Sequence, residues 1–584
     1  MFAQKRWIAW LLVLILTVAL VGPASAAVPE YDESSYTVQQ LEEIDFGTIN
    51  FNKDWKFYLS TAVGEFVEEI VVDGEVQQSS IKGGLKDGAE GPQTAEIIRP
   101  DFDDSSWRTV EVPHDWSFEF TRDKNAEGTT SGTGYLPGGV GFYRKTFVVP
   151  ASYEGKKISV DFDGVYMNAA VYVNGELVGE YPSGYLGFTF DISDYLRYGE
   201  ENVIVVRCSD KPASSRWYTG HGIYRDVNLL VDTQTRFVRN SVYLFTPTIG
   251  ETYPSDGTAE LNVTAELYSV NDVENASVVT TLYDANGEVY ATTTSDAVAL
   301  VANEKLAVAD AVTVEDPLLW SCDTPNMYTA VVELYDGDQL VDSYETPFGF
   351  KWFDVSATEG FSLNGETVLL KGVNLHHDNG LVGTASEPDA LDRKVKLMKD
   401  MGVNAIRTSH NPESQQFIDA CNKYGGIPEV ALSYTKSPVH THEYFVKLAV
   451  ELEKMGAKTI CIKDMANLLL PYEAYDLVKA LKAKVKVPIH LHTHNTSGTG
   501  DMVLLKAIEA GVDIVDTALS PLGNGTSQPA TEPLVATLAG TQYDTGLDLK
   551  LLTDISKHFK TVADRLKKDG FLDPKVLSVD INTL

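Results

Sequence analysis

The sequence predicts a multidomain chain of 584 residues, in which two β-sandwiches precede a region of alternating strands and helices. Short strands separated by turn residues fill residues 36–232, and the same pattern repeats over residues 236–347. From about residue 348 strands alternate with helices, which is typical of a parallel barrel or a doubly wound sheet. A chain of this length has room for three or four domains.

Strands with turns between them predict the first sandwich. Lys157–Val165 alternates between apolar and polar residues, and Glu201–Arg207 reads as a further strand. Ala169–Val173 leads into Asn174-Gly175, the dipeptide that favours a type I′ hairpin turn. The second region repeats this pattern in LNVTAELYSV, ASVVTTLYD and TAVVELYD, and its length is that of an immunoglobulin-like sandwich.

The third region begins with a predicted buried strand at Glu366–Leu375. Its later elements keep the alternation of strand and helix without a break at residue 425. The predicted helices are Glu387–Met401, Glu413–Tyr424, Glu443–Met455, Tyr472–Ala483, Met502–Ala510 and Thr531–Ala539. The predicted strands between them are Asn404–Ser409, Glu429–Tyr434, Thr459–Lys463, Val487–His494 and Ile514–Ala518.

Charge is spread unevenly along the chain. The formal net charge of −36 argues against nucleic acid or an anionic membrane as a partner. Residues 426–584 hold 17 Lys and Arg against 19 Asp and Glu, so nearly all of the negative charge lies upstream, as do all eight Trp. The composition changes near CNKYGGIPEV, residues 421–430, which suggests two segments of different origin.

The first 26 residues have the features of a secretory signal peptide. Lys5 and Arg6 precede an apolar run over residues 7–22, and Ala24-Ser25-Ala26 fits a cleavage site. The alternative is a membrane anchor, but the run is short for a span. Export to the periplasm, the cell surface or the medium is expected, with no membrane span after cleavage. The four cysteines form no CxxC pair, and we interpret them as buried thiols.

Residues 36–425 resemble family-2 glycoside hydrolases of the β-galactosidase type. Eight ordered motifs carry the resemblance: NKDWKFYLS, DDSSWRTVEVPHDWS, GGVGFYRKTF, VYVNGELVGEYPSGYLGFTFDIS, SSRWYTGHGIYRDV, DPLLWSCDTPNMYT, FSLNGETVLLKGVNLHHD and GVNAIRTSHNPESQQFIDACNKYG. The resemblance implies a jelly-roll sugar-binding domain (36–232), an immunoglobulin-like sandwich (236–347) and the first two βα units of a TIM barrel (348–425). The whole enzymes are retaining glycosidases, which need two carboxylates about 5–5.5 Å apart.

The resemblance ends before both catalytic carboxylates. In this family the acid/base lies in an Asn-Glu pair after the fourth barrel strand, and the nucleophile follows the seventh. No Asn-Glu pair follows Cys421, so we predict no hydrolysis. What remains is contact with a β-galactoside or related glycan, for which the candidate residues are Trp217, His376, Arg407, His410 and Asn411, where Tyr is usual. The alternative to sugar contact is a structural role. Arg407 and His410 would then be a buried pair that shapes the strand ends, and Trp217 would pack in the core.

Residues 426–584 resemble a second family, the carboxyltransferase subunit of oxaloacetate decarboxylase and the matching domain of pyruvate carboxylase. The matching runs include TICIKDMANLLLPYEAYDLVKAL, VPIHLHTHNTSGTG and DIVDTALSPLGNGTSQPATEPLVATLAG. The resemblance implies the second half of a TIM barrel, a biotin carrier protein as partner, and carboxybiotin as a substrate. Such proteins normally work in the cytoplasm, which conflicts with a secretory signal.

A divalent metal is implied for this second segment. His492 and His494 are two apart on a strand, so both point to the same face and suit zinc, manganese or cobalt. By resemblance Lys463 is carbamylated and becomes a metal ligand, and Thr526 shuttles a proton. The family's fourth ligand, an Asp on the first barrel strand, has no counterpart in residues 426–584. His376-His377-Asp378 ends the first strand here, so Asp378 is a candidate replacement.

The two segments meet at Gly425-Gly426 and together supply six barrel strands, two fewer than a TIM barrel needs. We therefore expect a composite, incomplete barrel with unpaired strand edges in a chimeric chain. Our first hypothesis is a β-galactosidase-like hydrolase that is inactive because its barrel is truncated. The alternatives are a carboxyltransferase or oxaloacetate decarboxylase fragment, and a non-catalytic carbohydrate-binding protein.

Overall fold

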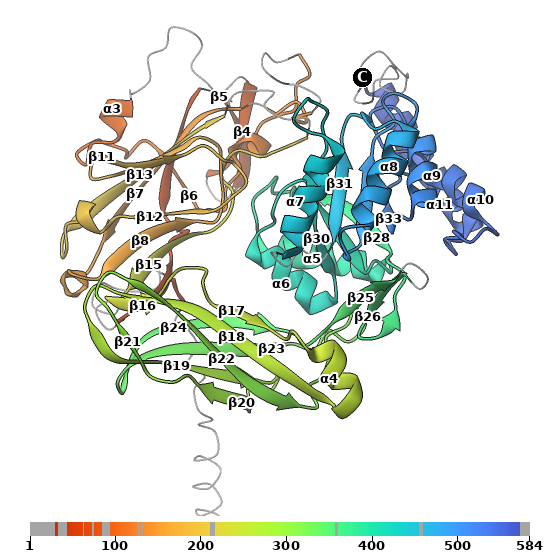
Figure 1. Ribbon diagram of the computed structural model, residues 1–584. Helices are drawn as coiled ribbons and strands as arrows, with labels where there is room; N and C mark the ends of the chain where they lie inside the picture. Colours follow the sequence, from red (N-terminus) through yellow and green to blue (C-terminus); the bar gives the residue numbers. More distant parts are fainter. Residues whose placement is uncertain are drawn as a thin grey trace, which may run out of the picture.

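A computed structural model gives the structure of the chain. It describes residues 30–32 and 44–572, apart from residues 62–63, 73–74, 84–93, 126–128, 130–131, 137, 211–216, 357–359, 455–458 and 571. The predicted signal peptide and most of the run FLDPKVLSVDINTL lie outside the described residues. Figure 1 shows two β-rich bodies and a third body in which helices flank strands.

The first body is a sandwich of two sheets. One sheet has the order β1 (Glu30–Asp32), β2 (Gly47–Asn50), β15 (Val227–Asp232), β8 (Lys157–Phe162) and β12 (Phe188–Asp191). The other has the order β11 (Glu176–Tyr181), β10 (Ala169–Val173), β13 (Glu201–Asp210), β7 (Gly139–Val148), β3 (Trp55–Thr61) and β6 (Arg108–Val110). The hairpin prediction is confirmed, since β10 pairs with β11 and both Asn174 and Gly175 have positive φ.

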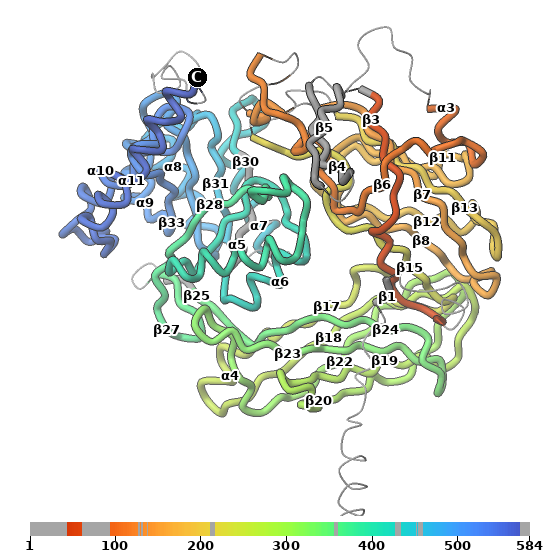
Figure 2. Tube along the Cα trace, turned by 180° about the vertical axis from the view of Figure 1, so that it is seen from behind, coloured from red at the N-terminus to blue at the C-terminus, as the bar shows by residue number. Residues whose placement is uncertain are grey.

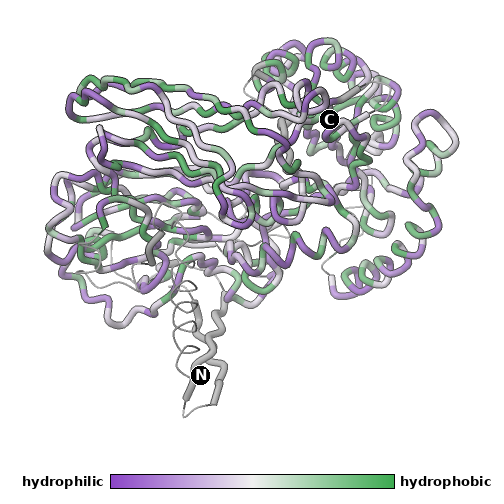
Figure 3. Tube along the Cα trace, turned by 90° about the horizontal axis from the view of Figure 1, so that it is seen from below, coloured by the Kyte–Doolittle hydropathy of each residue, from purple (hydrophilic) through white to green (hydrophobic). Residues whose placement is uncertain are grey.

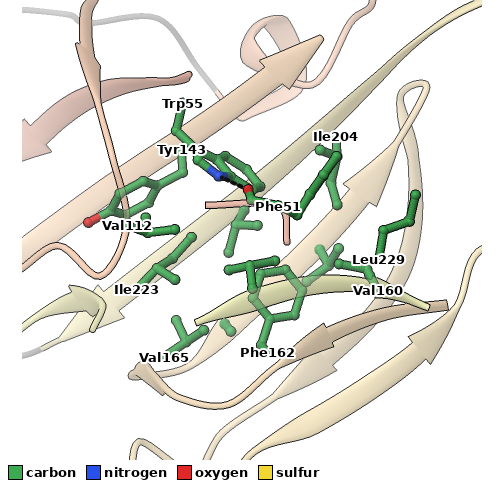
Figure 4. Packing of buried hydrophobic residues seen from close by; sticks show 14 of the residues in the cluster. Phe51, Trp55, Val112, Tyr143, Val160, Phe162, Val165, Ile204, Ile223 and Leu229 are labelled. Carbon is green, nitrogen blue, oxygen red and sulfur yellow. Dashed lines mark hydrogen bonds between the residues drawn. The ribbon is translucent and has the colours of Figure 1, made fainter. Parts of the chain in front are cut away.

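Aromatic and β-branched side chains from both sheets fill the core of this sandwich. Trp55 is fully buried and its indole Nε1 donates to the Phe51 carbonyl at 2.8 Å (Figure 4). Phe51 and Tyr143 meet the Trp55 ring edge to face. The body also holds β4 (Gly64–Val72) paired with β5 (Glu75–Gly83), β9 (Val165–Tyr166) paired with β14 (Gly222–Ile223), helix α3 (Thr94–Ile97) and 3-10 helices at Trp116–Glu119, Ala151–Tyr153 and Ser193–Tyr195.

The second body is a separate sandwich. One of its sheets joins β16 (Thr235–Phe237), β17 (Tyr243–Phe245), β18 (Thr258–Ser269) and β22 (Lys305–Glu315); the other joins β19 (Val273–Tyr283), β20 (Val289–Thr294), β21 (Val298–Leu300), β23 (Tyr328–Asp336) and β24 (Gln339–Phe348). Helix α4 (Ile249–Asp256) packs beside β18. Hydrophilic and hydrophobic residues alternate along the strands (Figure 3), as expected for sheets with one face buried.

A small sheet of β25 (Phe353–Ser356), β26 (Gly360–Leu363) and β27 (Glu366–Thr367) leads into the third body. That body is a six-stranded parallel sheet in chain order: β28 (Gly372–His376), β29 (Ala405–Ser409), β30 (Ile427–Ser433), β31 (Ile460–Asp464), β32 (Ile489–Thr493) and β33 (Ile514–Val515). Its helices are α5 (Pro388–Asp400), α6 (Gln415–Tyr424), α7 (His442–Lys454), α8 (Pro471–Lys482), α9 (Gly500–Ala510), α10 (Thr531–Leu538) and α11 (Leu549–Lys568) (Figure 2).

The predicted buried strand at Glu366–Leu375 is wrong in two respects. Residues 366–367 belong to β27 of the small sheet, and the parallel strand starts only at Gly372. Gly372 and Asn374 are exposed because β28 pairs with β29 alone. Among the described residues no pairing joins the two edge strands, β28 and β33, so the sheet is open. This agrees with the prediction that six strands are too few to close a TIM barrel.

The two segments of the chain share this sheet. Strand β30 is the first element past Gly425-Gly426, and it pairs in parallel with β29 on one side and with β31 on the other. Gly425 ends helix α6 in the left-handed region, with φ of 78°. A Cβ at this position would lie 2.2 Å from the Cys322 carbonyl oxygen, so only glycine fits between the helix and the second sandwich.

No helix in the described part of the chain is both long enough and apolar enough to cross a bilayer.

Candidate functional site

A row of aromatic and imidazole rings lies at the carboxyl ends of the parallel strands, where ligands bind in folds of this kind. Trp217, from the first sandwich, meets the His410 ring at 4.7 Å between centroids, and His376 lies 4.9 Å from His410. The His410 ring is 6.2 Å from that of His492, which lies 5.2 Å from His494. The row therefore brings together residues that were predicted separately for the two segments. We call this region the strand-end site.

A carboxylate of the first sandwich holds the sandwich against the parallel sheet beside this site. Asp115 is 4% exposed and accepts hydrogen bonds from Ser117, Tyr218 and the His221 backbone. It also accepts from the backbone N–H and the hydroxyl of Thr384, at 2.9 and 3.0 Å. Tyr218 adjoins Trp217 in sequence, and Thr384 precedes α5, so Asp115 helps to fix Trp217 over the strand ends.

Arg407 lies on β29 and is only 4% exposed. Its Nη1 donates to Asn374 Oδ1 at 2.9 Å and to Ser409 Oγ at 3.0 Å. Its Nε and Nη2 are buried and have no hydrogen-bond partner. The predicted neighbour Asn411 is half-buried, and its Nδ2 also has no partner. Arg407 is therefore a strand-end side chain with unused donors, as a ligand-contacting role requires.

Lys463 is the second cation of the strand-end site. In the β31–β32 register it lies opposite His492, and its Nζ sits 5.4 Å from the centre of the Trp217 ring. The side chain is 4% exposed, and burial together with the charge of Arg407 lowers its pKa to about 7. Burial and the charge of Lys463 also lower the pKa of His410 well below its ordinary value, so that imidazole is neutral.

His492 and His494 have their Nδ1 atoms occupied and their Nε2 atoms facing one point. His492 Nδ1 is 2.6 Å from Asp516 Oδ2, and His494 Nδ1 bonds to the Thr526 carbonyl. The two Nε2 atoms lie 3.5 and 3.4 Å from the side-chain nitrogen of Gln528. These contacts place Nδ1–H on each ring, so the Nε2 atom of each ring carries the lone pair that can accept a ligand.

Asp516 accepts a hydrogen bond from His492 and lies beside a second histidine. Its Oδ1 lies 3.0 Å from His490 Nε2, and its Oδ2 bonds His492. Burial alone would raise the pKa of this carboxyl, but the two imidazoles hold it well below its ordinary value. Burial lowers the pKa of His492 to about 4 despite Asp516, so His492 is neutral at physiological pH. Asp516 therefore fixes the orientation of His492 and the atom that carries its proton.

Other predicted residues lie apart from this centre. Thr526 has an exposed side chain, and only its carbonyl joins the site. His377 faces the first sandwich, where its Nε2 lies 3.1 Å from the Thr219 carbonyl. Asp378 is exposed. In the described parts of the chain no three His, Cys, Asp or Glu side chains gather as a metal-binding group, so Asp378 does not join the histidine pair as was suggested.

Asp516 and Gln528 belong to the site but were not predicted from the sequence. Asp516 lies just beyond β33, where polar side chains gather in parallel sheets, and this position was the available signal. Gln528 lies two residues from Thr526 in an irregular loop, and no periodic pattern could have identified it. A separate cavity of about 450 Å³ lies between the first sandwich and α6, lined by polar side chains that include Asp163, Arg239 and Gln416.

Comparisons with known protein families divide the chain in two. Residues 103–233 match the sugar binding domain of glycosyl hydrolases family 2, and residues 243–351 match a further domain of that family. Residues 384–558 match the HMGL-like family. That match begins upstream of Gly425, within the region that resembles glycoside hydrolases.

Individual relatives show the same division. A β-galactosidase of Bacteroides ovatus is 36% identical over 400 residues, which cover 68% of this chain and 42% of that protein. A pyruvate carboxylase subunit of Methanocaldococcus jannaschii is 46% identical over 207 residues, which cover 34% of this chain and 35% of that protein. The chain thus spans about two fifths or less of each of these curated relatives.

Solved structures agree with the fold. A glycosyl hydrolase family 2 member from Bacteroides cellulosilyticus has a TM-score of 0.59 at 30% identity, covering 79% of this chain and 57% of that one. The chain is therefore a chimera that joins part of a family-2 glycosyl hydrolase to part of an HMGL-like carboxyltransferase.

Proposed function

We propose that this chimera does not hydrolyse glycosides and that its strand-end site binds a divalent metal ion through His492 and His494. One observation carries the proposal: both Nε2 atoms lie within 3.5 Å of the same atom, the side-chain nitrogen of Gln528. An amide side chain can turn away, and a cation in its place would meet two imidazole nitrogens.

The surroundings of the pair suit this role. Metal-binding histidines usually donate their second N–H to a carboxylate or a carbonyl, and Asp516 and Thr526 supply one of each. Imidazole ligands favour zinc, cobalt and related ions. Lys463 lies opposite His492 in the register and, carbamylated as in the carboxyltransferase family, would add an oxygen ligand. When bound, the ion would polarise a carbonyl group of an α-keto acid.

The absence of glycoside hydrolysis follows from the carboxylates. The acid/base and the nucleophile of family-2 enzymes follow the fourth and seventh barrel strands, positions that carboxyltransferase-like sequence occupies here. Asp516 is held by His490 and His492, and Asp464 accepts from the backbone N–H groups of Leu468 and Leu469. We therefore expect the chain to leave a chromogenic β-galactoside intact. Turnover well above that of a blank would contradict the proposal.

Carbohydrate binding without catalysis is a second candidate. The favouring observation is the Trp217 ring, which lies beside His376 and His410 at the strand ends, because sugar faces pack on aromatic rings. On this proposal the first two bodies are the jelly-roll and immunoglobulin-like domains of an exported galactoside-binding protein. In the carboxyltransferase alternative, carboxybiotin on a biotin carrier protein and oxaloacetate or pyruvate are the substrates, and pyruvate release from oxaloacetate is the assay.

Cobalt substitution tests metal binding directly. The full chain, freed of metal by a chelator, is titrated with Co²⁺ and followed by its visible absorption and by metal analysis. We expect about one ion per chain, lost in a His492→Ala/His494→Ala double variant. His558→Ala, which changes an exposed histidine on α11, is the matched control and should bind as the parent does. Equal binding by the parent and the double variant would refute the site.

A further inference from the structure

Arg407 carries a buried positive charge that the described protein does not neutralise. The guanidinium stays protonated at any physiological pH. Its Nη1 donates hydrogen bonds to two neutral oxygens, Asn374 Oδ1 and Ser409 Oγ. Within the described chain no carboxylate forms an ion pair with the Arg407 guanidinium. A buried charge without a counter-charge is strongly unfavourable, because the protein interior does not replace the hydration that the charge has in water. The arrangement therefore favours binding of an anion.

The unused donors of Arg407 form one edge of the guanidinium. Nε–H and the outer N–H of Nη2 point the same way, and both atoms are buried without partners. This edge matches the two oxygens of a carboxylate, which accepts two parallel hydrogen bonds from it. Asn374 and Ser409 fix the opposite side of the group through Nη1, so the unused edge has a set direction.

A second cation lies close by, on the other side of the junction. Lys463 is 4% exposed and makes no ion pair among the described side chains. Its Nζ lies 5.4 Å from the centre of the Trp217 ring, and that ring meets His410, three residues beyond Arg407, at 4.7 Å between centroids. The Nδ1 atoms of His376 and His410 are also buried without partners. Asp516, whose Oδ2 lies 2.6 Å from His492 Nδ1, is already occupied by His490 and His492.

We propose that Arg407 and Lys463 form a binding site for a small carboxylate anion. Arg407 comes from the glycosidase-like segment and Lys463 from the carboxyltransferase-like segment, so the fusion itself creates the site. Trp217 lies against Lys463 and contacts His410, so we expect the ligand to be a compact anion such as acetate, pyruvate or oxalate. The site uses neither His492 nor His494, and it requires the free amine of Lys463, so it forms only while Lys463 is not carbamylated as a metal ligand.

Calorimetric titration of the full, metal-free chain with acetate, pyruvate and oxalate tests the proposal, in CO₂-free buffer of constant ionic strength. Arg407→Lys keeps the charge but removes the two-donor edge, and we expect at least a tenfold loss of affinity. Lys463→Met is neutral and similar in volume, and should also weaken binding about tenfold. Arg393→Lys, at an exposed arginine on α5, is the matched control.

Three outcomes would overturn the site. Carboxylate binding that is equal in the parent and in Arg407→Lys would show that the guanidinium edge is not used. Equal binding of chloride would show a site without carboxylate recognition. Binding only of bicarbonate, with a covalent mass increase on Lys463, would identify a carbamate as the partner of Arg407. Circular dichroism confirms folding, and if Arg407→Lys fails to fold, Lys463→Met decides.

Discussion

Replacing Lys463 by Met should stabilise the third body, by an amount that depends on pH. The side chain is 4% exposed, and burial is the main reason why its pKa falls from 10.5 to about 7. The folded state therefore disfavours the charged amine. Methionine has a similar length and no charge, so it fills the same space beside the Trp217 ring without this cost.

The sign follows from proton binding. Above pH 10.5 the amine is neutral in both states, and the cost vanishes. As the pH falls from 10.5 to about 7, the unfolded chain binds a proton that the folded chain does not, so the free energy of unfolding falls by about 1.4 kcal/mol per pH unit. Below about pH 7 both states are protonated, and the cost stays constant at no more than about 5 kcal/mol.

Urea unfolding at pH 7 and at pH 9 measures this difference. Far-UV circular dichroism follows the helices, most of which belong to the third body. The stabilisation of Lys463→Met over the parent should shrink by about 2–3 kcal/mol between these two pH values. Lys550→Met, at an exposed lysine on α11, should show no such pH dependence. A stabilisation that is the same at both pH values, or is absent at pH 7, would refute the reasoning.

Three further variants test the contacts around the site. Gly425→Ala should destabilise the third body by about 2–5 kcal/mol, because both the positive φ and the close Cys322 carbonyl oppose a Cβ. The control Gly402→Ala has a φ of 86° but open space around the Cβ, so it should cost only about 1–2 kcal/mol. Equal losses of unfolding free energy in urea would contradict a steric clash at Gly425. Asp115→Asn should lower the free energy of unfolding by about 1–3 kcal/mol, since an amide nitrogen cannot accept from Thr384, and limited proteolysis should then cut between the first sandwich and α5 sooner. Asp516→Asn should weaken Co²⁺ binding about 10–100-fold in the cobalt titration, and an unchanged affinity would exclude Asp516 as the residue that orients His492.

Much of the third body could be predicted from local pattern. His492 and His494 share a face because strand side chains alternate, and the structure places both at the strand ends. The helices fall near their predicted bounds because apolar spacing and end signals agree, as in α9, which ends at the left-handed Gly511. Helix α11 was not predicted, although Asp548 caps it through the backbone N–H groups of Lys550 and Leu551.

The local sequence pattern could not predict which distant elements pair or pack together. Strand β28 looks buried in sequence, but it is an edge strand, and its exposure depends on the missing neighbour rather than on its own residues. The proximity of Trp217 to Lys463 depends on how the first sandwich docks on the sheet, which no local signal encodes. The unused edge of Arg407 likewise appears only when the strands on both sides are in place.

The central claim is that the two segments fold into one continuous sheet, and hydrogen exchange of β30 tests it most directly. Strand β30 pairs with β29 of one segment and with β31 of the other. Peptide-level exchange should therefore show amides of residues 427–433 protected as strongly as those of β31 and β32. Exchange of β30 at the rate of an open loop, with β31 and β32 still protected, would contradict the claim and show two segments that fold apart.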